Sequence, residues 1–412
     1  MKQSYDKWLL LILLLLILVG LTAVYSSTSV ISPDLLEKYR KKGVALSQFG
    51  FIKKQLFTVL LGIAVLFAAY KVPLETLRRM AIPLLLLSLV CLGLVFTPLG
   101  ITAGGARRWI RIWPSTFQPS ELVKLSMVVF LAWYTSLPGF RGESLKSFAL
   151  PIAVMGGFQV VFLKQPDFGA AMSLALLTVA MLYLAGIHWK YLLSLGALGI
   201  PVVIKLISEP YRWKRVVAFL DPWKDAQGSG FQLVQSFIAL GSGGLTGVGL
   251  GEGKQKLFFL PEVHTDFIFS MIGEELGFVG AVLVALLFCS LFLKGIQIAR
   301  RAEASPFSCN LAYGVSLMIA IQAIMNFAVV TGMVPTKGLP LPFISYGGSS
   351  MIVNMMAVGL LLNVSKGKKG VETLPGGVPK RQAHLSRDVR DTVSIPRPPR
   401  WQRGYGYSRY RK

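Results

Sequence analysis

The chain has 412 residues, of which 53% are hydrophobic and only 15% are charged, and its mean hydropathy is +0.59. This composition excludes an ordinary soluble domain, and repeated apolar runs of about 20 residues indicate an all-α, polytopic helical membrane protein. The formal net charge of +24 would suggest nucleic acid as a partner in a soluble protein. Here the basic residues fall into separate loops and a tail, so we expect no nucleic acid.

The apolar runs predict ten membrane spans in chain order. Their ranges are 8–27, 56–72, 80–98, 119–137, 147–163, 169–187, 190–208, 266–293, 307–331 and 347–364. The first run is longer than the core of a signal peptide and no A-x-A site follows it, so we interpret it as an uncleaved span. An even number of spans places both termini on one side, and the basic tail favours the cytoplasm for that side.

We expect residues 1–365 to form the membrane domain, with a long outer loop at 209–265 between spans 7 and 8. A loop of this length is usually functional, and we expect it to fold back onto the membrane surface as short helices. Residues 366–412 are basic and rich in Pro and Gly, which predicts a disordered cytoplasmic tail attracted to anionic lipids.

The first constellation of polar residues is GGARRWIRIWPSTFQPSELVKLS, residues 104–126. Its arginines alternate with tryptophans at an outer span end, where aromatic belts and snorkelling cations are common. Glu121 and Lys124 are harder to dismiss, because at i, i+3 inside a span they can neutralise each other as a buried pair. LKQPDFGAA places Lys164 and Asp167 at another outer span end beside a proline.

The stretch LPEVHTDFIFSMIGEELGFVG, residues 260–280, places carboxylates at the mouth and inside of a span. Asp266 directly precedes the apolar run and is either a helix N-cap or a functional acid, two roles that are compatible. Glu274 lies about 80° round the helix from Asp266 and can share its side. Glu275 lies on the opposite side, so we expect it to pair with a neighbouring helix.

Two loop features suggest ligand sites, each with a simpler alternative. Glu262, His264 and Asp266 at i, i+2 and i+4 can hold a divalent cation, although exposed loop polarity also explains them. The Gly-rich segment 241–253 lacks the Walker spacing, but with Lys254 and Lys256 it can form an anion nest or simply a flexible loop.

These features together predict an outer pocket with one carboxylate and many cations. Transfer of a sugar from a lipid pyrophosphate needs a base for the acceptor hydroxyl and positive charge on the leaving group. A glycoside hydrolase instead uses two carboxylates. A transporter could line its path with the same charges.

Several motifs resemble those of the SEDS family (shape, elongation, division and sporulation), in the family's order and across nearly the whole membrane portion. They are ARRWI…FQPSE..K, QPDFG, YRWKR…DPW, QLVQSFIALGSGGL.G.GLG.G.QK, LPEVHTDFIFSMIGEELG and PTKGLPLPFISYGG. The wording of the last two is more like the division branch of the family than the elongation branch.

The resemblance implies a peptidoglycan glycosyltransferase that polymerises lipid II on the outer face of the bacterial inner membrane, at the division septum. It implies Asp266 as the general base and a substrate site that includes Arg108, Trp109, Glu121, Lys124 and Asp167. It also implies a class B penicillin-binding protein (a monofunctional transpeptidase) and other divisome membrane proteins as partners, and support from a divalent cation, Mg or Mn.

We expect Asp266 to take the proton from the 4-hydroxyl of a lipid II or chain-end sugar, which then attacks the donor with inversion and releases undecaprenyl pyrophosphate. Glu274 is expected to supply supporting charge at the substrate site. The candidates for holding pyrophosphate, in falling order, are Arg108, Lys124, Arg212, Arg215 and Lys256. The alternatives are a lipid II flippase and a divisome scaffold without catalysis.

Overall fold

A computed structural model describes residues 6–28, 48–103, 106–112, 115–208, 210–255 and 264–366. The tail predicted from residue 366 onward lies outside the described residues except for Lys366.

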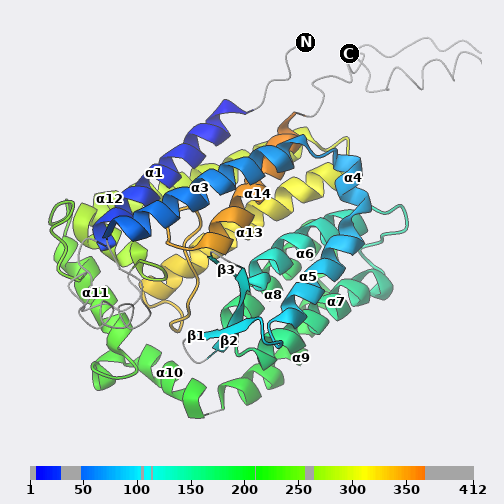
Figure 1. Cartoon of the computed structure of the whole chain (residues 1–412). Helices are drawn as coiled ribbons and strands as arrows, with labels where there is room; N and C mark the ends of the chain where they lie inside the picture. Colours follow the sequence, from blue (N-terminus) through cyan, green and yellow to red (C-terminus); the bar gives the residue numbers. More distant parts are fainter. Residues whose placement is uncertain are drawn as a thin grey trace, which may run out of the picture. The chain divides into compact units, whose positions relative to one another are not determined.

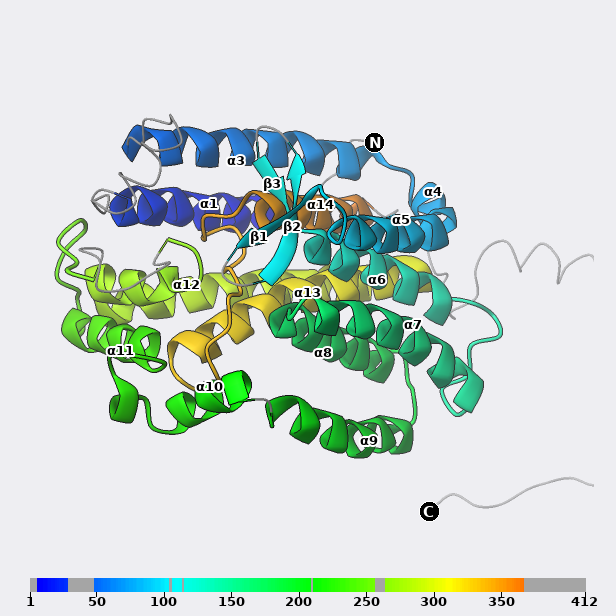
Figure 2. The same ribbon diagram turned by 60° about the horizontal axis from the view of Figure 1, so that its bottom comes forward.

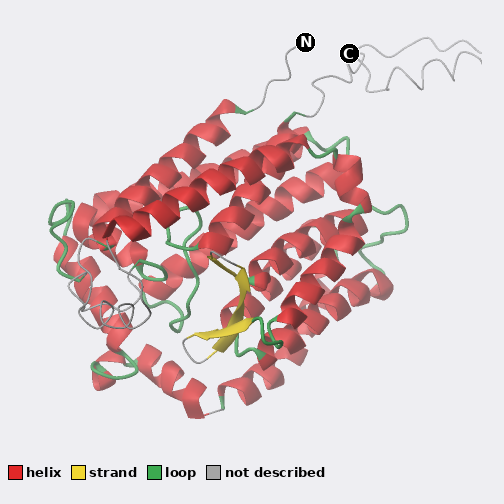
Figure 3. Ribbon diagram, viewed as in Figure 1, coloured by secondary structure: helices red, strands yellow, loops and turns green. Residues whose placement is uncertain are grey.

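The described chain is a bundle of long helices with very little strand (Figures 1 and 3). Each of the ten predicted spans corresponds to a helix: α1 (Lys7–Ser27), α3 (Gln48–Lys71), α5 (Ala81–Leu94), α6 (Pro119–Thr135), α7 (Leu145–Lys164), α8 (Phe168–Leu184), α9 (Trp189–Ile207), α12 (Ile268–Arg301), α13 (Pro306–Val330) and α14 (Gly348–Ser365). A short helix, α4 (Leu74–Arg79), precedes α5. The prediction of an all-α, polytopic fold is therefore confirmed.

Length and composition separate these helices into classes. Six are long and apolar enough to cross a membrane, namely α1, α3, α7, α12, α13 and α14, while α5 and α8 are shorter apolar helices. The centre is formed by α6, α12, α13 and α14, whose buried faces contribute most of the apolar core. Successive helices alternate in direction, so α1 begins and α14 ends at the same end of the bundle (Figure 1).

The opposite end of the bundle, which we call the site end, carries the additional elements. The long loop after α9 contains the helices α10 (Pro210–Leu220), η1 (Pro222–Asp225) and α11 (Phe231–Gly243). Short helices in this loop were predicted from the sequence. Figure 2 shows α10 close to the loop that joins α13 to α14. Asp266, at the start of α12, and the loop between α5 and α6 also belong to this end.

A small antiparallel sheet at the site end was not predicted. Strands β1 (Gly100–Ala103), β2 (Ala106–Ile112) and β3 (Ser115–Phe117) pair in the order β1-β2-β3. The register shifts after Ile101, which pairs with Trp109, because Thr102 pairs with Arg107 and leaves Arg108 as the extra residue. Such a bulge redirects a side chain out of the regular alternation.

Helix α12 is broken at Gly277, whose φ of 68° and ψ of −168° are not helical. The Gly-rich segment after α11 fills the break, because the amides of Val248 and Gly249 donate to the carbonyls of Glu274 and Glu275. In return, Phe278 donates to the carbonyl of Gly244. A helix can be interrupted inside a membrane protein only where other groups satisfy its backbone, and this segment does so.

The close approach at the break predicts that Gly277 cannot be replaced. A Cβ on Gly277 would lie 2.2 Å from the amide nitrogen of Gly247, and its positive φ is unfavourable for other residues. We expect Gly277→Ala to lower the free energy of unfolding by at least about 2 kcal/mol. Thermal unfolding of the purified protein in detergent, followed by tryptophan fluorescence, measures this loss.

Gly157→Ala on α7 is the matched control, because a Cβ there meets nothing within 4 Å. Its midpoint should equal or exceed that of the wild type, since Ala favours helix. Equal midpoints for the two variants would contradict the role assigned to Gly277.

Candidate active site

Asp266 lies in the turn that leads into α12 at the site end. The N-cap of α12 is Phe267, which makes no side-chain cap hydrogen bond, so Asp266 is not the helix cap that the sequence allowed. The backbone just before Asp266 is held by the loop between α13 and α14, residues 331–347, which we call the proline loop. The amide of Tyr346 donates to the carbonyl of His264 at 2.9 Å, and the hydroxyl of Ser345 donates to that of Thr265 at 2.6 Å.

Asn326, which is 1% exposed near the end of α13, fixes Asp266 itself. Its side-chain amide donates to the carbonyl of Asp266 at 2.8 Å and to that of Leu339 at 2.7 Å. One side chain inside the bundle thus joins the turn at Asp266 to the proline loop. In the sequence, Asn326 is a polar residue within the predicted span 307–331.

The carboxylate of Asp266 lies directly against Gly338 of the proline loop. A Cβ on Gly338 would be 2.6 Å from Oδ2 of Asp266, so a glycine is what allows this approach. The residue before it, Lys337, is the cation that sequence reasoning missed, although the motif PTKGLPLPFISYGG contains it.

Lys337 lies between α8 and α10. Its ammonium is 5.5 Å from the centre of the Phe168 ring, at the first position of α8. Arg215 of α10 donates to the carbonyl of Thr336 at 3.4 Å, one residue before Lys337. Burial lowers the pKa of Lys337 from 10.5 to about 8; Asp167 raises it, and the positive charge of Arg215 lowers it further.

Arg108 and Asp167, both predicted site residues, lie together at the site end. The Arg108 guanidinium donates to the carbonyl of Pro166 at 2.5 Å, and its Nε is 4.0 Å from Oδ2 of Asp167. Asp167 is 4% exposed and caps α8 by accepting the amide of Ala170 at 3.1 Å. Trp109 follows Arg108 in β2 and is half-buried. The structure therefore brings Arg108, Asp167 and Arg215 towards Lys337.

Glu121 and Lys124 form the buried pair that their spacing predicted. The Lys124 ammonium is 2.8 Å from Oε1 of Glu121, both side chains are at most 3% exposed, and Gln322 donates to the second carboxylate oxygen at 3.2 Å. The positive charge of Lys124 is thus neutralised by Glu121 inside the bundle. The prediction that Lys124 holds pyrophosphate does not fit this arrangement.

Glu274 and Glu275 belong to the break in α12. The Glu274 carboxylate accepts the amide of Lys254 at 2.8 Å and that of Gln255 at 3.3 Å, so it holds the Gly-rich segment rather than facing the substrate side with Asp266. The predicted anion nest therefore binds an anion of the protein itself. Glu275 accepts the hydroxyl of Ser26 on α1 at 2.6 Å, as expected of a residue that pairs with a neighbouring helix.

Some predicted residues fall outside what the structure describes. Lys256 and Glu262 lie in the gap at 256–263, and the side chain of Arg212 is not described either. Among the described residues, no group of three His, Cys, Asp or Glu side chains converges on one point. His264 instead packs edge-on against the rings of Phe51 and Tyr346. Because Glu262 lies outside the described residues, the divalent-cation site expected at Glu262, His264 and Asp266 stays a prediction, and we assign no step to it.

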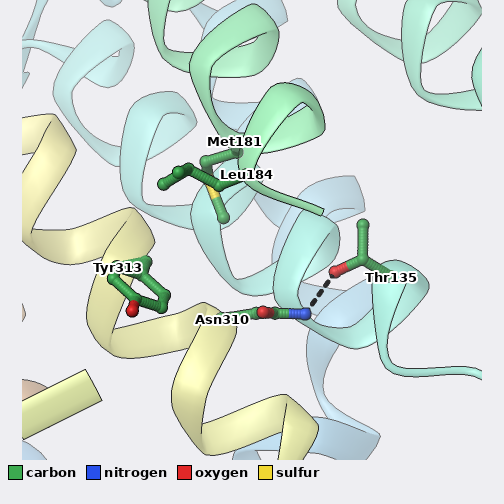
Figure 4. Close-up of a pocket in the computed structure, with 5 residues that line it drawn as sticks. All are labelled: Thr135, Met181, Leu184, Asn310 and Tyr313. Carbon is green, nitrogen blue, oxygen red and sulfur yellow. Dashed lines mark hydrogen bonds between the residues drawn. The ribbon is translucent and has the colours of Figure 1, made fainter. Parts of the chain in front are cut away.

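A small hollow at the other end of the bundle is unrelated to this chemistry. It has a volume of about 10 Å³ and is lined by Thr135, Met181, Leu184, Asn310 and Tyr313, with Asn310 donating to Thr135 at 2.8 Å (Figure 4). This is room for about one water molecule. The hollow lies at the ends of α6 and α13 that are far from Glu121 and Asn326.

The buried pair of Glu121 and Lys124 predicts that the stability losses of the two single variants do not add in the double variant. Glu121→Gln or Lys124→Met alone leaves one buried charge uncompensated, and we expect each to cost about 3–5 kcal/mol of stability. The double variant removes both charges and should recover most of that loss. Thermal unfolding midpoints of the four proteins in detergent measure the coupling; single effects that simply add would contradict the pair.

Comparison with known proteins agrees with this geometry. A family model described as "Cell cycle protein", for FtsW, RodA and SpoVE, matches residues 6–370. The "Probable peptidoglycan glycosyltransferase FtsW" of Geobacter sulfurreducens is 42% identical over 371 residues, covering 89% of this chain and 97% of its own. The "Stage V sporulation protein E" of Bacillus subtilis is 39% identical over 372 residues, covering 89% and 98%.

Two solved structures are also similar. A chain from a study of the coordination of polymerization and crosslinking by a peptidoglycan synthase complex has a TM-score of 0.71 and 29% identity, covering 88% of this chain and 98% of its own. The rod shape determining protein RodA of Thermus thermophilus has a TM-score of 0.65 and 26% identity, covering 89% and 98%. The chain therefore belongs to the FtsW, RodA and SpoVE family of cell cycle proteins, the family that its motifs resemble.

Proposed function

We propose that this chain, a peptidoglycan glycosyltransferase of cell division by its family, polymerises lipid II with Asp266 as the general base. The observation that carries the assignment is the setting of Asp266. Its backbone is fixed by Asn326, and its carboxylate lies against Gly338 of the proline loop.

In the proposed reaction, Asp266 accepts the proton of the 4-hydroxyl of one lipid II or chain-end sugar. The oxygen attacks the anomeric carbon of the donor, the bond to pyrophosphate breaks, and undecaprenyl pyrophosphate leaves with the bonding electrons. The leaving group needs positive charge rather than a general acid. Arg108 and Arg215 are the candidates for that role, because both reach the region between α8, α10 and the proline loop.

Rigid placement of the base supports catalysis rather than mere binding. A general base contributes about 10²–10⁴-fold when it is held within hydrogen-bond reach of the proton it removes. The two donors of Asn326 and the contacts at His264 and Thr265 hold the turn at Asp266 in one backbone path. A scaffold without catalysis has no need of such precision.

Four arginines at the other end of the bundle, rather than the overall distribution of Lys and Arg, support an orientation with the site end outside the cytoplasm. Arg78 and Arg79 in α4 and Arg300 and Arg301 at the end of α12 lie at the end of the bundle opposite Asp266. Positive residues next to spans favour the cytoplasmic side. We propose cytoplasmic termini, a multi-pass location in the bacterial inner membrane at the division septum, and a class B penicillin-binding protein as the crosslinking partner.

The base assignment predicts that Asp266→Asn abolishes polymerisation without unfolding the protein. We expect the rate of lipid II polymerisation, with the cognate transpeptidase present, to fall by at least about 100-fold, because the amide cannot accept the proton. The measurement is the length distribution of glycan strands formed by purified protein.

Glu252→Gln is the control, since Glu252 is an exposed carboxylate of the same outer loop. Its rate should stay within about twofold of the wild type. Near-normal polymerisation by Asp266→Asn would sink the base assignment. A flippase would instead move lipid II between the leaflets of vesicles while never lengthening glycan, in the wild type as well as in both variants.

A further inference from the structure

Lys337 is a half-buried cation at the site end. It belongs to the proline loop, which carries no regular secondary structure between α13 and α14 but is tied to the turn at Asp266 along its length. The position of Lys337 is thus set by the same contacts that set Asp266.

The surroundings of Lys337 hold its ammonium without neutralising it. The Phe168 ring lies 5.5 Å from the ammonium and offers the negative face of its π-system. Asp167 attracts the ammonium, but Asp167 also serves Arg108, at 4.0 Å, and the amide of Ala170. Arg215 adds a second positive charge on the side of α10.

The pKa of Lys337 reflects the combined effect of burial and of the charges around it. Burial and Arg215 lower it, Asp167 raises it, and the net result is a pKa of about 8 instead of 10.5. The charged groups that face the region are Asp167 at the start of α8, Arg215 on α10, Arg108 on β2 and Asp266 beyond Gly338. Burial is the largest cause of the lowered pKa, so an anion that enters beside the ammonium would stabilise its charged form and raise the pKa of the lysine.

The position relative to Asp266 decides which anion this is. Lys337 is bonded to Gly338, and Gly338 touches the Asp266 carboxylate. In an in-line transfer, base, acceptor oxygen, anomeric carbon and leaving oxygen follow each other, with contacts of roughly 3 Å at each step. The ammonium of Lys337 lies with Asp167 and Arg215, so a diphosphate that extends from a sugar at Asp266 along the proline loop would meet it.

We propose that Lys337 is the cation that binds the diphosphate of the glycosyl donor and stabilises the leaving oxygen, with Asp167 and the Phe168 ring holding the ammonium in place before substrate arrives. This inference rests on the proposed polymerase function and adds a residue to it. Lys337 takes the pyrophosphate-binding role that was predicted for Lys124, because the ammonium of Lys124 is paired with Glu121. As the C–O bond of the donor breaks, its electron pair passes to the diphosphate oxygen beside Lys337, while the proton of the acceptor passes to Asp266.

The test compares Lys337→Met, Lys337→Arg and the control Lys224→Met, which removes an exposed lysine from the long outer loop at 209–265. Two measurements are made on the purified full chain with its transpeptidase: the rate of lipid II polymerisation and the Kd for undecaprenyl pyrophosphate. Lys337→Met should bind undecaprenyl pyrophosphate at least about 10-fold more weakly, the loss of one charge-assisted hydrogen bond, and polymerise at least about 100-fold more slowly. Lys224→Met should match the wild type in both measurements.

The two proposals fail in different ways. Asp266→Asn should lose polymerisation but keep the wild-type Kd, whereas Lys337→Met should lose both. If Lys337→Met binds undecaprenyl pyrophosphate as tightly as the wild type, the role of Lys337 is refuted while Asp266 stands. If the wild type binds the diphosphate but makes no glycan, the polymerase function fails while the site at Lys337 stands.

The dependence on pH adds a readout that a structural role would not move. The kcat/KM of the wild type should fall above about pH 8, because free Lys337 then loses its proton. In Lys337→Arg this fall should disappear, because arginine stays charged. The same alkaline fall in Lys337→Arg would show that another group titrates and would overturn the assignment.

Discussion

The site depends on one side chain that donates two hydrogen bonds. The Asn326 amide reaches the carbonyl of Asp266 on one side and that of Leu339 on the other, from a buried position in α13. Both carbonyls belong to segments without regular structure, and neither segment could hold its path alone. Because one rigid helix fixes both, the carboxylate and the cationic loop keep their relative positions whatever lies between them.

The proline loop is rigid enough to serve as the other half of this arrangement. Phe343, which is 2% exposed, adopts a left-handed φ of 63°, a conformation that costs about 1–3 kcal/mol in a bulky residue. Such a residue persists only where its surroundings over-determine it. Here Gly20 of α1 lets the loop come close, since a Cβ on Gly20 would lie 2.6 Å from the carbonyl of Phe343. Packing of α1 against the proline loop thus helps to fix the path of that loop.

The sequence predicted the features that depend on local pattern. The apolar runs predicted ten segments that are all helical, six of them long and apolar enough to cross a membrane. The i, i+3 spacing of Glu121 and Lys124 predicted their pairing. It could not predict what depends on distant contacts. Glu274 serves amides 20 residues away, and Gly277 breaks a helix only because the Gly-rich segment fills the gap. Lys337 looked like an ordinary loop cation until the fold set it against Phe168.

The partners of the other acidic residues explain why a single carboxylate suffices here. Glu121 is held by Lys124, Glu274 by two amides, Glu275 by Ser26 and Asp167 by Arg108 and the start of α8. A second catalytic carboxylate, as a retaining hydrolase requires at about 5 Å from the first, would have to abandon one of these partners. Transfer from a diphosphate makes no such demand, because its leaving group is already an anion and needs only cations. These acidic residues stabilise the bundle, so in the proposed reaction Asp266 would carry the proton transfer alone.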